Sequence, residues 1–162
     1  MSNLHRLELV STAIDTVIGY LCIIFGMAMT VSTLIGILFR YVMTNPLPWT
    51  EELARYAMIW MGLLAVSMGV RRESHLGLNI VVNLLPAAIQ KVLRYIVRIL
   101  IGVFLYFLMV YGYTMAANGM HQTMPALRLP MICILAAVPA CALFSLIQLA
   151  LISAIDFIGK GE

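Results

Sequence analysis

Three long stretches of the sequence contain no charged side chain, and they constrain the fold more than any other feature. They run from Thr16 to Phe39, from Ile99 to His121 and from Leu129 to Ile155, and contain 24, 23 and 27 residues. About 20 apolar residues in a helix suffice to cross the roughly 30 Å hydrocarbon core of a bilayer. Each stretch is therefore expected to form a transmembrane helix.

A fourth uncharged run, Tyr56 to Val70, has 15 residues and becomes long enough to span if its helix begins near Thr50. The composition agrees, because 63% of the residues are hydrophobic and 10% are charged, against about 25% charged in a soluble domain. The sequence thus predicts an all-α membrane protein, with residues 1–162 forming one integral membrane domain. The four transmembrane helices are expected at about residues 11–41, 50–71, 86–119 and 129–157.

Two segments are predicted to lie outside the hydrocarbon core. Apolar residues recur at helical spacing from Leu7 to Leu21, so the first helix should begin before it enters the membrane. Residues 76–85, "LGLNIVVNLL", are apolar but too short to span. We expect a short interfacial amphipathic helix at about residues 75–85, between the second and third spans.

The distribution of Lys and Arg predicts the orientation. With four spans, seven of these residues lie on the side that holds both termini and three lie on the other side. The positive-inside rule then places both termini in the cytoplasm. Five of the seven are predicted to contact phospholipid headgroups, although a protein partner for this basic surface is an alternative. They are Arg71, Arg72, Lys91, Arg94 and Arg98.

The spans lack the groups that several membrane functions require. No ionisable side chain lies near the middle of any predicted span, which argues against a proton exchanger or a carrier that binds ions by itself. The three histidines lie at predicted membrane edges and cannot form an axial pair for haem. We find no catalytic motif and no cysteine pair with metal-ligand spacing. We therefore expect neither enzymatic activity nor a cofactor or metal, and the net charge of +3 is no indication of nucleic-acid binding.

Small residues form stripes that permit close helix packing. They comprise Gly19, Cys22, Gly26, Thr33 and Gly36 in the first span, Gly62, Ala65 and Gly69 in the second, and Gly102, Gly112, Ala116 and Gly119 in the third. These stripes could contact sister helices or another subunit. In the fourth span, Pro139 is expected to kink the helix and free a carbonyl group near Leu135.

Charged and aromatic residues gather in "PLPWTEELARYAMIW", residues 46–60. Thr50 is predicted to cap the second helix, and Glu51 should form an ion pair with Arg55 one turn later. Arg40, at the end of the first helix, should approach the carboxylates across the hairpin. This cluster could simply hold the hairpin together at the membrane interface, or it could also be a docking surface for a partner.

Residues 39–86 resemble the hallmark region of the small membrane subunit of TRAP transporters, the tripartite ATP-independent periplasmic family. The matching elements are Arg40-Tyr41, Pro48-Trp49-Thr50-Glu51-Glu52, Arg55-Tyr56, Trp60, Arg71-Arg72 and His75. A departure is Glu73-Ser74, where the family often has glycine.

The resemblance implies a non-catalytic scaffold in the bacterial inner membrane. Its partners would be a large membrane subunit that binds substrate and sodium, and a periplasmic substrate-binding protein that delivers an organic acid such as sialic acid or a C4-dicarboxylate. The residues expected in a partner interface or structural charge cluster are Arg40, Tyr41, Trp49, Glu51, Glu52, Arg55, Tyr56 and Trp60. The alternative is a self-sufficient, homo-oligomeric membrane channel or carrier.

Overall fold

The protein is a bundle of long helices. The computed structural model describes residues 2–71 and 87–158. The elements are α1 (Ser2–Tyr41), α2 (Pro48–Arg71), α4 (Ala87–Asn118), the 3-10 turn η1 (Gly119–His121), α5 (Ile132–Leu135) and α6 (Ala137–Ile158). Four helical segments are long and apolar enough to cross a membrane: Leu7–Tyr41, Pro48–Arg71, Tyr95–His121 and Ile132–Asp156. The prediction of an all-α protein with four such helices is confirmed, whereas the interfacial helix expected at 75–85 lies outside the described residues.

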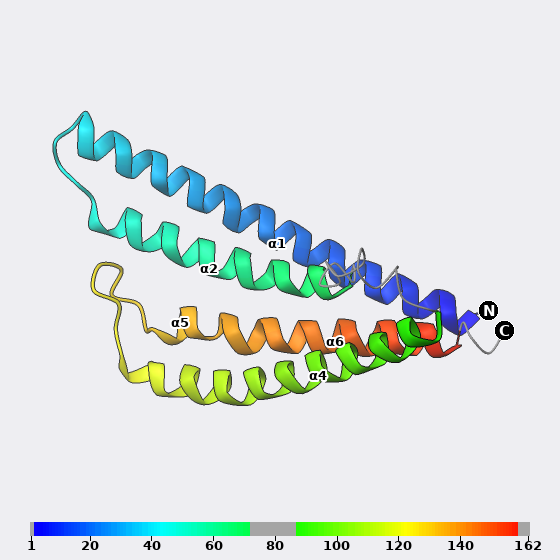
Figure 1. The fold of residues 1–162 in the computed structure, drawn as a ribbon. Helices are drawn as coiled ribbons and strands as arrows, with labels where there is room; N and C mark the ends of the chain where they lie inside the picture. The colour runs from blue at the N-terminus through cyan, green and yellow to red at the C-terminus, as the bar shows by residue number, and fades with distance from the viewer. Residues whose placement is uncertain (1, 72–86, 159–162) are drawn as a thin grey trace.

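The helices lie side by side in the order α1, α2, α6, α4 (Figure 1). The loops 42–47 and 122–131 lie at one end of the bundle, which we call the loop end. Both chain termini lie at the other end, the terminal end (Figure 1). Each of α2 and α6 packs against helices on both sides, whereas α4 packs chiefly on α6. Helices α1 and α4 therefore leave most of their surface to whatever surrounds the protein.

The first two helices begin earlier than predicted. Helix α1 starts at Ser2 rather than near residue 11 and continues without a break to Tyr41. The prediction that it begins before the uncharged run at Thr16 is confirmed. Helix α2 starts at Pro48 rather than at Thr50. Proline is favourable at the first position of a helix, because its fixed φ suits the helix and its missing N–H would have no partner there. Pro48 thus begins the helix, two residues before the predicted start.

The last span is not one continuous helix from residue 129. Residues 129–131 belong to the preceding loop, where Met131 N–H donates to the Gln122 carbonyl over 2.8 Å. The helix is then interrupted at Ala136, between α5 and α6. Since Pro139 has no N–H to offer the carbonyl of Leu135, the helix is weakened at the place where the sequence predicts a kink.

The small-residue stripes on α1 and α4 are used within the chain. A Cβ atom at Gly36 would lie 2.8 Å from Thr50 Oγ1 on α2. A Cβ atom at Gly112 would lie 2.9 Å from Val138 Cγ1 and 3.3 Å from Pro139 N. Glycine is needed at both positions because the facing segments approach so closely. Gly62 differs, because its Cβ position has no neighbour within 4 Å.

Neutral polar side chains are buried between α1, α2 and α6. Ser11 Oγ donates to Gln148 Oε1 over 2.8 Å, and Gln148 Nε2 donates to the Ser11 carbonyl over 3.2 Å. Cys141 Sγ donates to the Leu63 carbonyl over 2.8 Å. Ser11 is 2% exposed and Gln148 is fully buried. Hydrogen bonds of this kind hold transmembrane helices together where hydrophobic packing gives no net drive.

Candidate functional site

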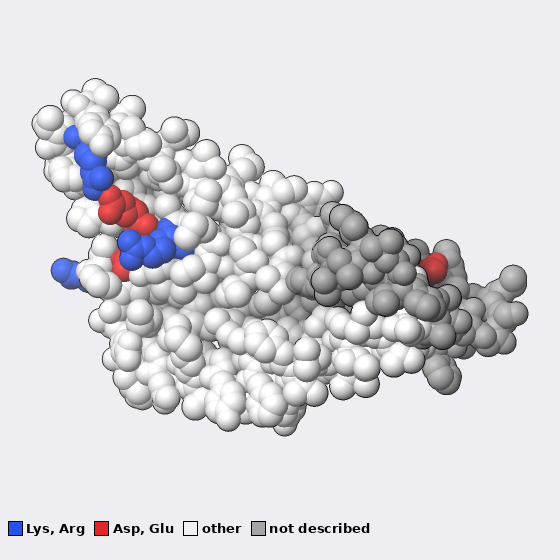
Figure 2. All heavy atoms as spheres, in the orientation of Figure 1, with Lys and Arg blue, Asp and Glu red and all other residues white. Residues whose placement is uncertain are grey.

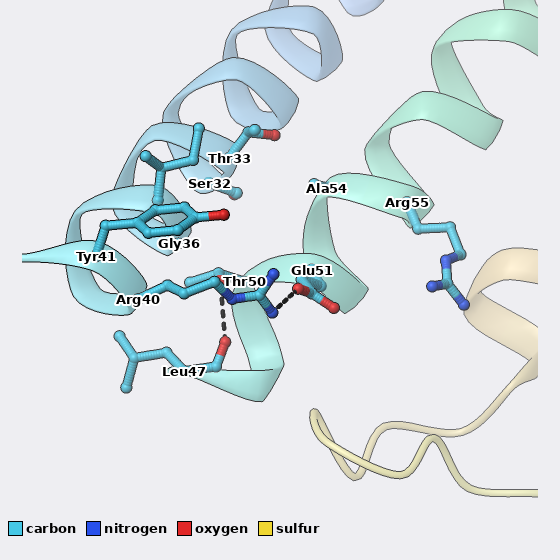
Figure 3. Close-up of a pocket in the computed structure, with 11 residues that line it drawn as sticks. Ser32, Thr33, Gly36, Arg40, Tyr41, Leu47, Thr50, Glu51, Ala54 and Arg55 are labelled. Carbon is cyan, nitrogen blue, oxygen red and sulfur yellow. Dashed lines mark hydrogen bonds and ion pairs between the residues drawn. The ribbon is translucent and has the colours of Figure 1, made fainter. Parts of the chain in front are cut away.

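The charged cluster at the loop end begins with an ion pair across the first hairpin. Arg40, in the last turn of α1, pairs with Glu51 in the first turn of α2 (Figure 3). Their side chains are 53% and 58% exposed. The predicted approach of Arg40 to the carboxylates is thus confirmed for Glu51. Exposed ion pairs contribute only about 0–1 kcal/mol, so this one adds little to the stability of the hairpin.

The predicted ion pair between Glu51 and Arg55 is wrong. Arg55 points away from Glu51 (Figure 3), and its guanidinium makes no ion pair with any residue in the ranges 2–71 and 87–158. An i, i+4 pair contributes only a few tenths of a kcal/mol. Arg40 engages Glu51 from across the hairpin instead, which leaves Arg55 exposed.

The predicted capping role of Thr50 is also wrong. Thr50 lies inside the first turn of α2, and its hydroxyl donates to the Leu47 carbonyl over 2.7 Å instead of accepting a bond from a backbone N–H (Figure 3). The side chain is buried beneath Gly36 of α1. The early helix start at Pro48 is the reason, because it moves Thr50 past the capping position.

Glu52 connects the two hairpins. One carboxylate oxygen accepts a hydrogen bond from the Tyr56 hydroxyl at 2.5 Å. The other accepts bonds from the backbone N–H groups of Ala126 at 2.9 Å and Leu127 at 2.6 Å. Both amides belong to the loop 122–131. Although neighbours in sequence, Glu51 and Glu52 thus have separate roles: Glu51 closes the α1–α2 hairpin, and Glu52 holds the loop between α4 and α5.

The aromatic residues of the cluster divide into two groups. Trp60 stacks on Phe25 of α1, with ring centroids 5.7 Å apart, and its Nε1–H donates to the Cys133 carbonyl over 2.9 Å. It therefore ties α1, α2 and α5 together. Tyr41 and Trp49, in contrast, are 74% and 36% exposed at the loop end, where interfacial aromatic residues are common.

A pocket of about 360 Å³ opens between the ends of α1 and α2. Arg40, Glu51 and Arg55 line its charged side, and Ile37 and Leu47 contribute apolar walls (Figure 3). The pocket offers charged groups of both signs to the exterior. None of the described residues forms a group of three or more metal-ligating side chains.

One residue of the loop end was missed by the sequence reasoning. Arg128 lies in the loop 122–131 with φ 54°, in the left-handed region, and is exposed. Like Arg55, it forms no ion pair with a residue that the structure describes. Charged side chains gather at the loop end of the face in Figure 2, and the described residues in the middle of that face show none. Only the three-dimensional arrangement reveals that the loop lies beside Glu52.

At the terminal end, two of the five predicted lipid-contacting residues have partners within the chain. Arg71 pairs with Asp15 at 2.8 Å and donates to Thr12 Oγ1 over 2.8 Å. Arg98 pairs with Asp156 at 2.5 Å. Arg72 and the side chains of Lys91 and Arg94 lie outside the described parts of the chain. Contact of these five residues with lipid headgroups stays a prediction.

These features define the class of protein. Four apolar helices are tied by neutral polar contacts inside the bundle and by charged groups near its two ends, as in a multi-pass membrane protein. Residues 29–157 match the family model described as tripartite ATP-independent periplasmic transporters, DctQ component. The chain belongs to this family, and the resemblance seen in residues 39–86 is confirmed.

Three relatives show how the match is distributed. A putative TRAP transporter small permease protein of Haemophilus influenzae is 27% identical over 151 residues, which cover 92% of this chain and 94% of the relative. The C4-dicarboxylate TRAP transporter small permease protein of Vibrio cholerae is 31% identical over 77 residues, 48% of this chain and 33% of the relative. The sialic acid TRAP transporter permease protein of Haemophilus influenzae is 34% identical over 76 residues, 47% of this chain but only 12% of that longer protein.

Proposed function

We propose that this protein is the small, non-catalytic membrane subunit of a sodium-driven tripartite transporter for an organic acid. Sialic acid and a C4-dicarboxylate are the two candidate substrates, because relatives carry these names. In this role the chain scaffolds a large membrane subunit, and both of its termini face the cytoplasm. The loop end then faces the periplasm.

The observation that carries the proposal is the position of the ionisable groups. Asp, Glu, Lys and Arg are absent from all four apolar runs, which are Thr16–Phe39, Tyr56–Val70, Ile99–His121 and Leu129–Ile155. The contacts buried between α1, α2 and α6 include the neutral pair Ser11–Gln148. Binding of sodium or an organic anion inside a membrane usually requires charged or convergent polar groups. A scaffold needs none, and the large subunit would supply them.

Reconstitution in liposomes tests the division of labour. The purified chain alone should take up neither sialic acid nor a C4-dicarboxylate under an inward sodium gradient. Liposomes that contain the chain together with the large subunit, supplied with the binding protein, should take up one of them. Sodium-dependent uptake by the chain alone would refute the scaffold role.

The exposed cations of the loop end support a second part of the proposal, docking of the periplasmic binding protein. The two carboxylates there are already engaged, Glu51 by Arg40 and Glu52 by the loop amides. Arg55 and Arg128 are exposed, and neither forms an ion pair with a described residue. Glu52 keeps its own negative charge, because all of its hydrogen-bond donors are neutral groups. Three arginines (Arg40, Arg55 and Arg128) against two glutamates still leave the loop end with a net positive charge, which suits an acidic protein surface.

The docking role predicts an effect of charge on binding. Arg55→Gln and Arg128→Gln should each weaken binding of the substrate-binding protein to the reconstituted complex, and the loss should be larger at low salt, where charge attraction is least screened. Glu8→Gln changes one charge at the terminal end and serves as the control. Binding that is equal in all three variants would leave the cluster with a purely structural role.

The alternative of a self-sufficient homo-oligomer predicts a different composition of the purified complex. Native mass spectrometry of the affinity-purified protein from cells that express the complete transporter distinguishes the two. A large hydrophobic partner supports the scaffold, and copies of the chain alone support the homo-oligomer.

A further inference from the structure

Helix α4 exposes a continuous stripe of side chains along one side, and most of them are large. The stripe consists of Leu100, Phe104, Phe107, Tyr111, Thr114 and Asn118. The spacing alternates between four and three residues, which is the pattern by which one helix packs along another. Leu100, Phe104 and Tyr111 are 69%, 64% and 68% exposed, so no part of the described chain covers them. We call this surface the α4 stripe.

Tyr111 lies deep within the span. It is 13 residues beyond Arg98, which pairs with Asp156 near the terminal end, and 10 residues before His121 at the loop end. At 1.5 Å per residue these separations are about 20 Å and about 15 Å. The Tyr111 backbone therefore lies near the middle of a hydrocarbon core of about 30 Å.

The Tyr111 hydroxyl has no hydrogen-bond partner in residues 2–71 or 87–158. The ring stacks on Phe107, with centroids 6.2 Å apart, and projects from the helix. A hydroxyl group transferred from water to hydrocarbon without a partner costs several kcal/mol. Tyrosine in membrane proteins accordingly prefers the interfaces, where its hydroxyl reaches water. A partner outside the described chain is the simplest way to satisfy this group.

Tyr106 and Tyr113, 55% and 71% exposed on another side of α4, each lie eight residues from Arg98 or His121, about 12 Å from the nearer end of the span. Tyr111 is therefore the deepest of the three.

Threonines on these helices do not pose the same problem. Thr114 donates its hydroxyl to the Val110 carbonyl over 3.1 Å, and Thr30 on α1 donates to the Gly26 carbonyl over 2.9 Å. A threonine hydroxyl can thus bond to its own helix, as both of these do. The tyrosine hydroxyl is held too far from the backbone to do so.

Helix α1 provides the comparison. Its exposed side also carries large residues, including Ile24 at 60% and Leu34 at 60% exposed, but these are aliphatic. Its exposed tyrosines lie near the ends of the span: Tyr41 follows Arg40, and Tyr20 is five residues from Asp15, about 8 Å along the helix. This is the distribution expected of a surface that faces lipid, with aliphatic residues in the middle and tyrosines at the interfaces.

We propose that the α4 stripe is the surface that binds a transmembrane helix of the large subunit, and that this helix supplies an acceptor for the Tyr111 hydroxyl. The inference rests on the proposed scaffold function and adds the surface through which it acts. The partner must be integral to the membrane, because the stripe lies within the span. In the sialic acid permease relative, the segment similar to this chain is only 12% of a much longer permease, which favours a large membrane partner over a second copy.

Site-specific photocrosslinking tests the surface in the complete transporter. A benzophenone amino acid replaces Tyr111 in one variant and Ile24, on the exposed side of α1, in the control. After irradiation of membranes, we expect the large subunit to crosslink to position 111 and not to position 24. The proposal is overturned if position 24 crosslinks and position 111 does not, or if position 111 reaches only lipid or a second copy of the chain.

Co-purification separates this inference from the proposed function. If the large subunit co-purifies with both variants but crosslinks only through α1, the scaffold role stands and the α4 stripe is wrong. If no large subunit co-purifies with the unmodified chain, both proposals fail.

The Tyr111→Phe variant tests the hydroxyl alone, because it keeps the ring and its stacking on Phe107. Loss of one hydrogen bond between transmembrane helices should weaken association of the two subunits about threefold. Tyr20→Phe, the control on α1, should leave association unchanged. Equal association constants for Tyr111→Phe and the unmodified protein would show that the partner helix supplies no acceptor for the Tyr111 hydroxyl.

Discussion

Glu52 accepts a hydrogen bond of 2.6 Å from the backbone N–H of Leu127, 75 residues further along the chain. This contact joins the N-terminal half of the bundle to the loop that precedes α5. Two of the loop's amides have the same carboxylate as acceptor, so a single side chain fixes the local backbone. The loop that carries Arg128 is thereby held beside α2.

We predict that Glu52→Ala releases this loop. Hydrogen bonds to a charged acceptor are stronger than those to a neutral one, and the two loop amides would lose their acceptor. Limited digestion with trypsin in detergent should then show faster cleavage after Arg128. The control is Glu51→Ala, which breaks the exposed pair with Arg40 and should leave cleavage after Arg128 unchanged. Equal rates for the two variants would contradict the assigned role of Glu52.

The buried pair of Ser11 and Gln148 should contribute to stability in a coupled way. Gln148→Leu or Ser11→Ala leaves one polar group without its side-chain partner, and each should lower the free energy of unfolding by about 1–2 kcal/mol. The double variant should lose less than the sum of the two single losses. Reversible unfolding in mixed micelles measures all three. Strict additivity would show that the two side chains do not act as a pair.

Gly112 and Gly62 differ in how closely other residues pack against them. Gly112→Ala places a methyl group 2.9 Å from Val138 Cγ1, and the overpacking should cost about 1–3 kcal/mol. Gly62→Ala places the same group where no atom lies within 4 Å, so stability should stay the same or rise. The melting temperatures of the two variants in detergent give the comparison. A larger drop in melting temperature for Gly62→Ala than for Gly112→Ala would show that Gly112 is not the more tightly packed of the two.

The ion pair of Asp15 and Arg71 should hold α1 against α2 at the terminal end. Its side chains are 14% and 25% exposed, so the pair is partly shielded from solvent. Arg71→Gln leaves Asp15 largely buried without its cation, and this should destabilise the protein more than Arg40→Gln at the exposed pair. Unfolding measured for both variants at the same salt concentration decides the order. If Arg40→Gln is the more damaging change, the partly buried pair of Asp15 and Arg71 is not the stronger of the two ion pairs.

Part of this structure could be predicted from the sequence because it depends on local patterns. The uncharged runs suffice to locate four helices that can cross a membrane, and the lack of an N–H on Pro139 locates the weak point in the last span. Helix ends were less accurate. The uncharged run predicts a helix start near Thr50, with Thr50 as the cap, whereas the fixed φ of Pro48 lets the helix begin two residues earlier.

The contacts of the candidate site could not be predicted in the same way, because most of them join distant parts of the chain. Whether Glu51 forms its ion pair with Arg55 or with Arg40 depends on how closely the ends of α1 and α2 approach each other. Glu52 accepts hydrogen bonds from the backbone N–H groups of a distant loop, and the side chains of that loop give no sign of these bonds. Gln148 offered a signal that was missed, since an amide within an apolar span usually has a polar partner in a neighbouring helix.

The separation of α1 and α4 to opposite edges of the bundle bears on the stoichiometry of the assembly. The two edges differ in chemistry. Near the middle of the span, α4 exposes the phenol ring of Tyr111, whereas α1 exposes aliphatic side chains. Once a helix occupies the α4 stripe, the exposed side of α1 offers a second helix no tyrosine at the same depth. The chain should therefore assemble with its membrane partner in a one-to-one ratio, and the opposite edge should remain in contact with lipid acyl chains.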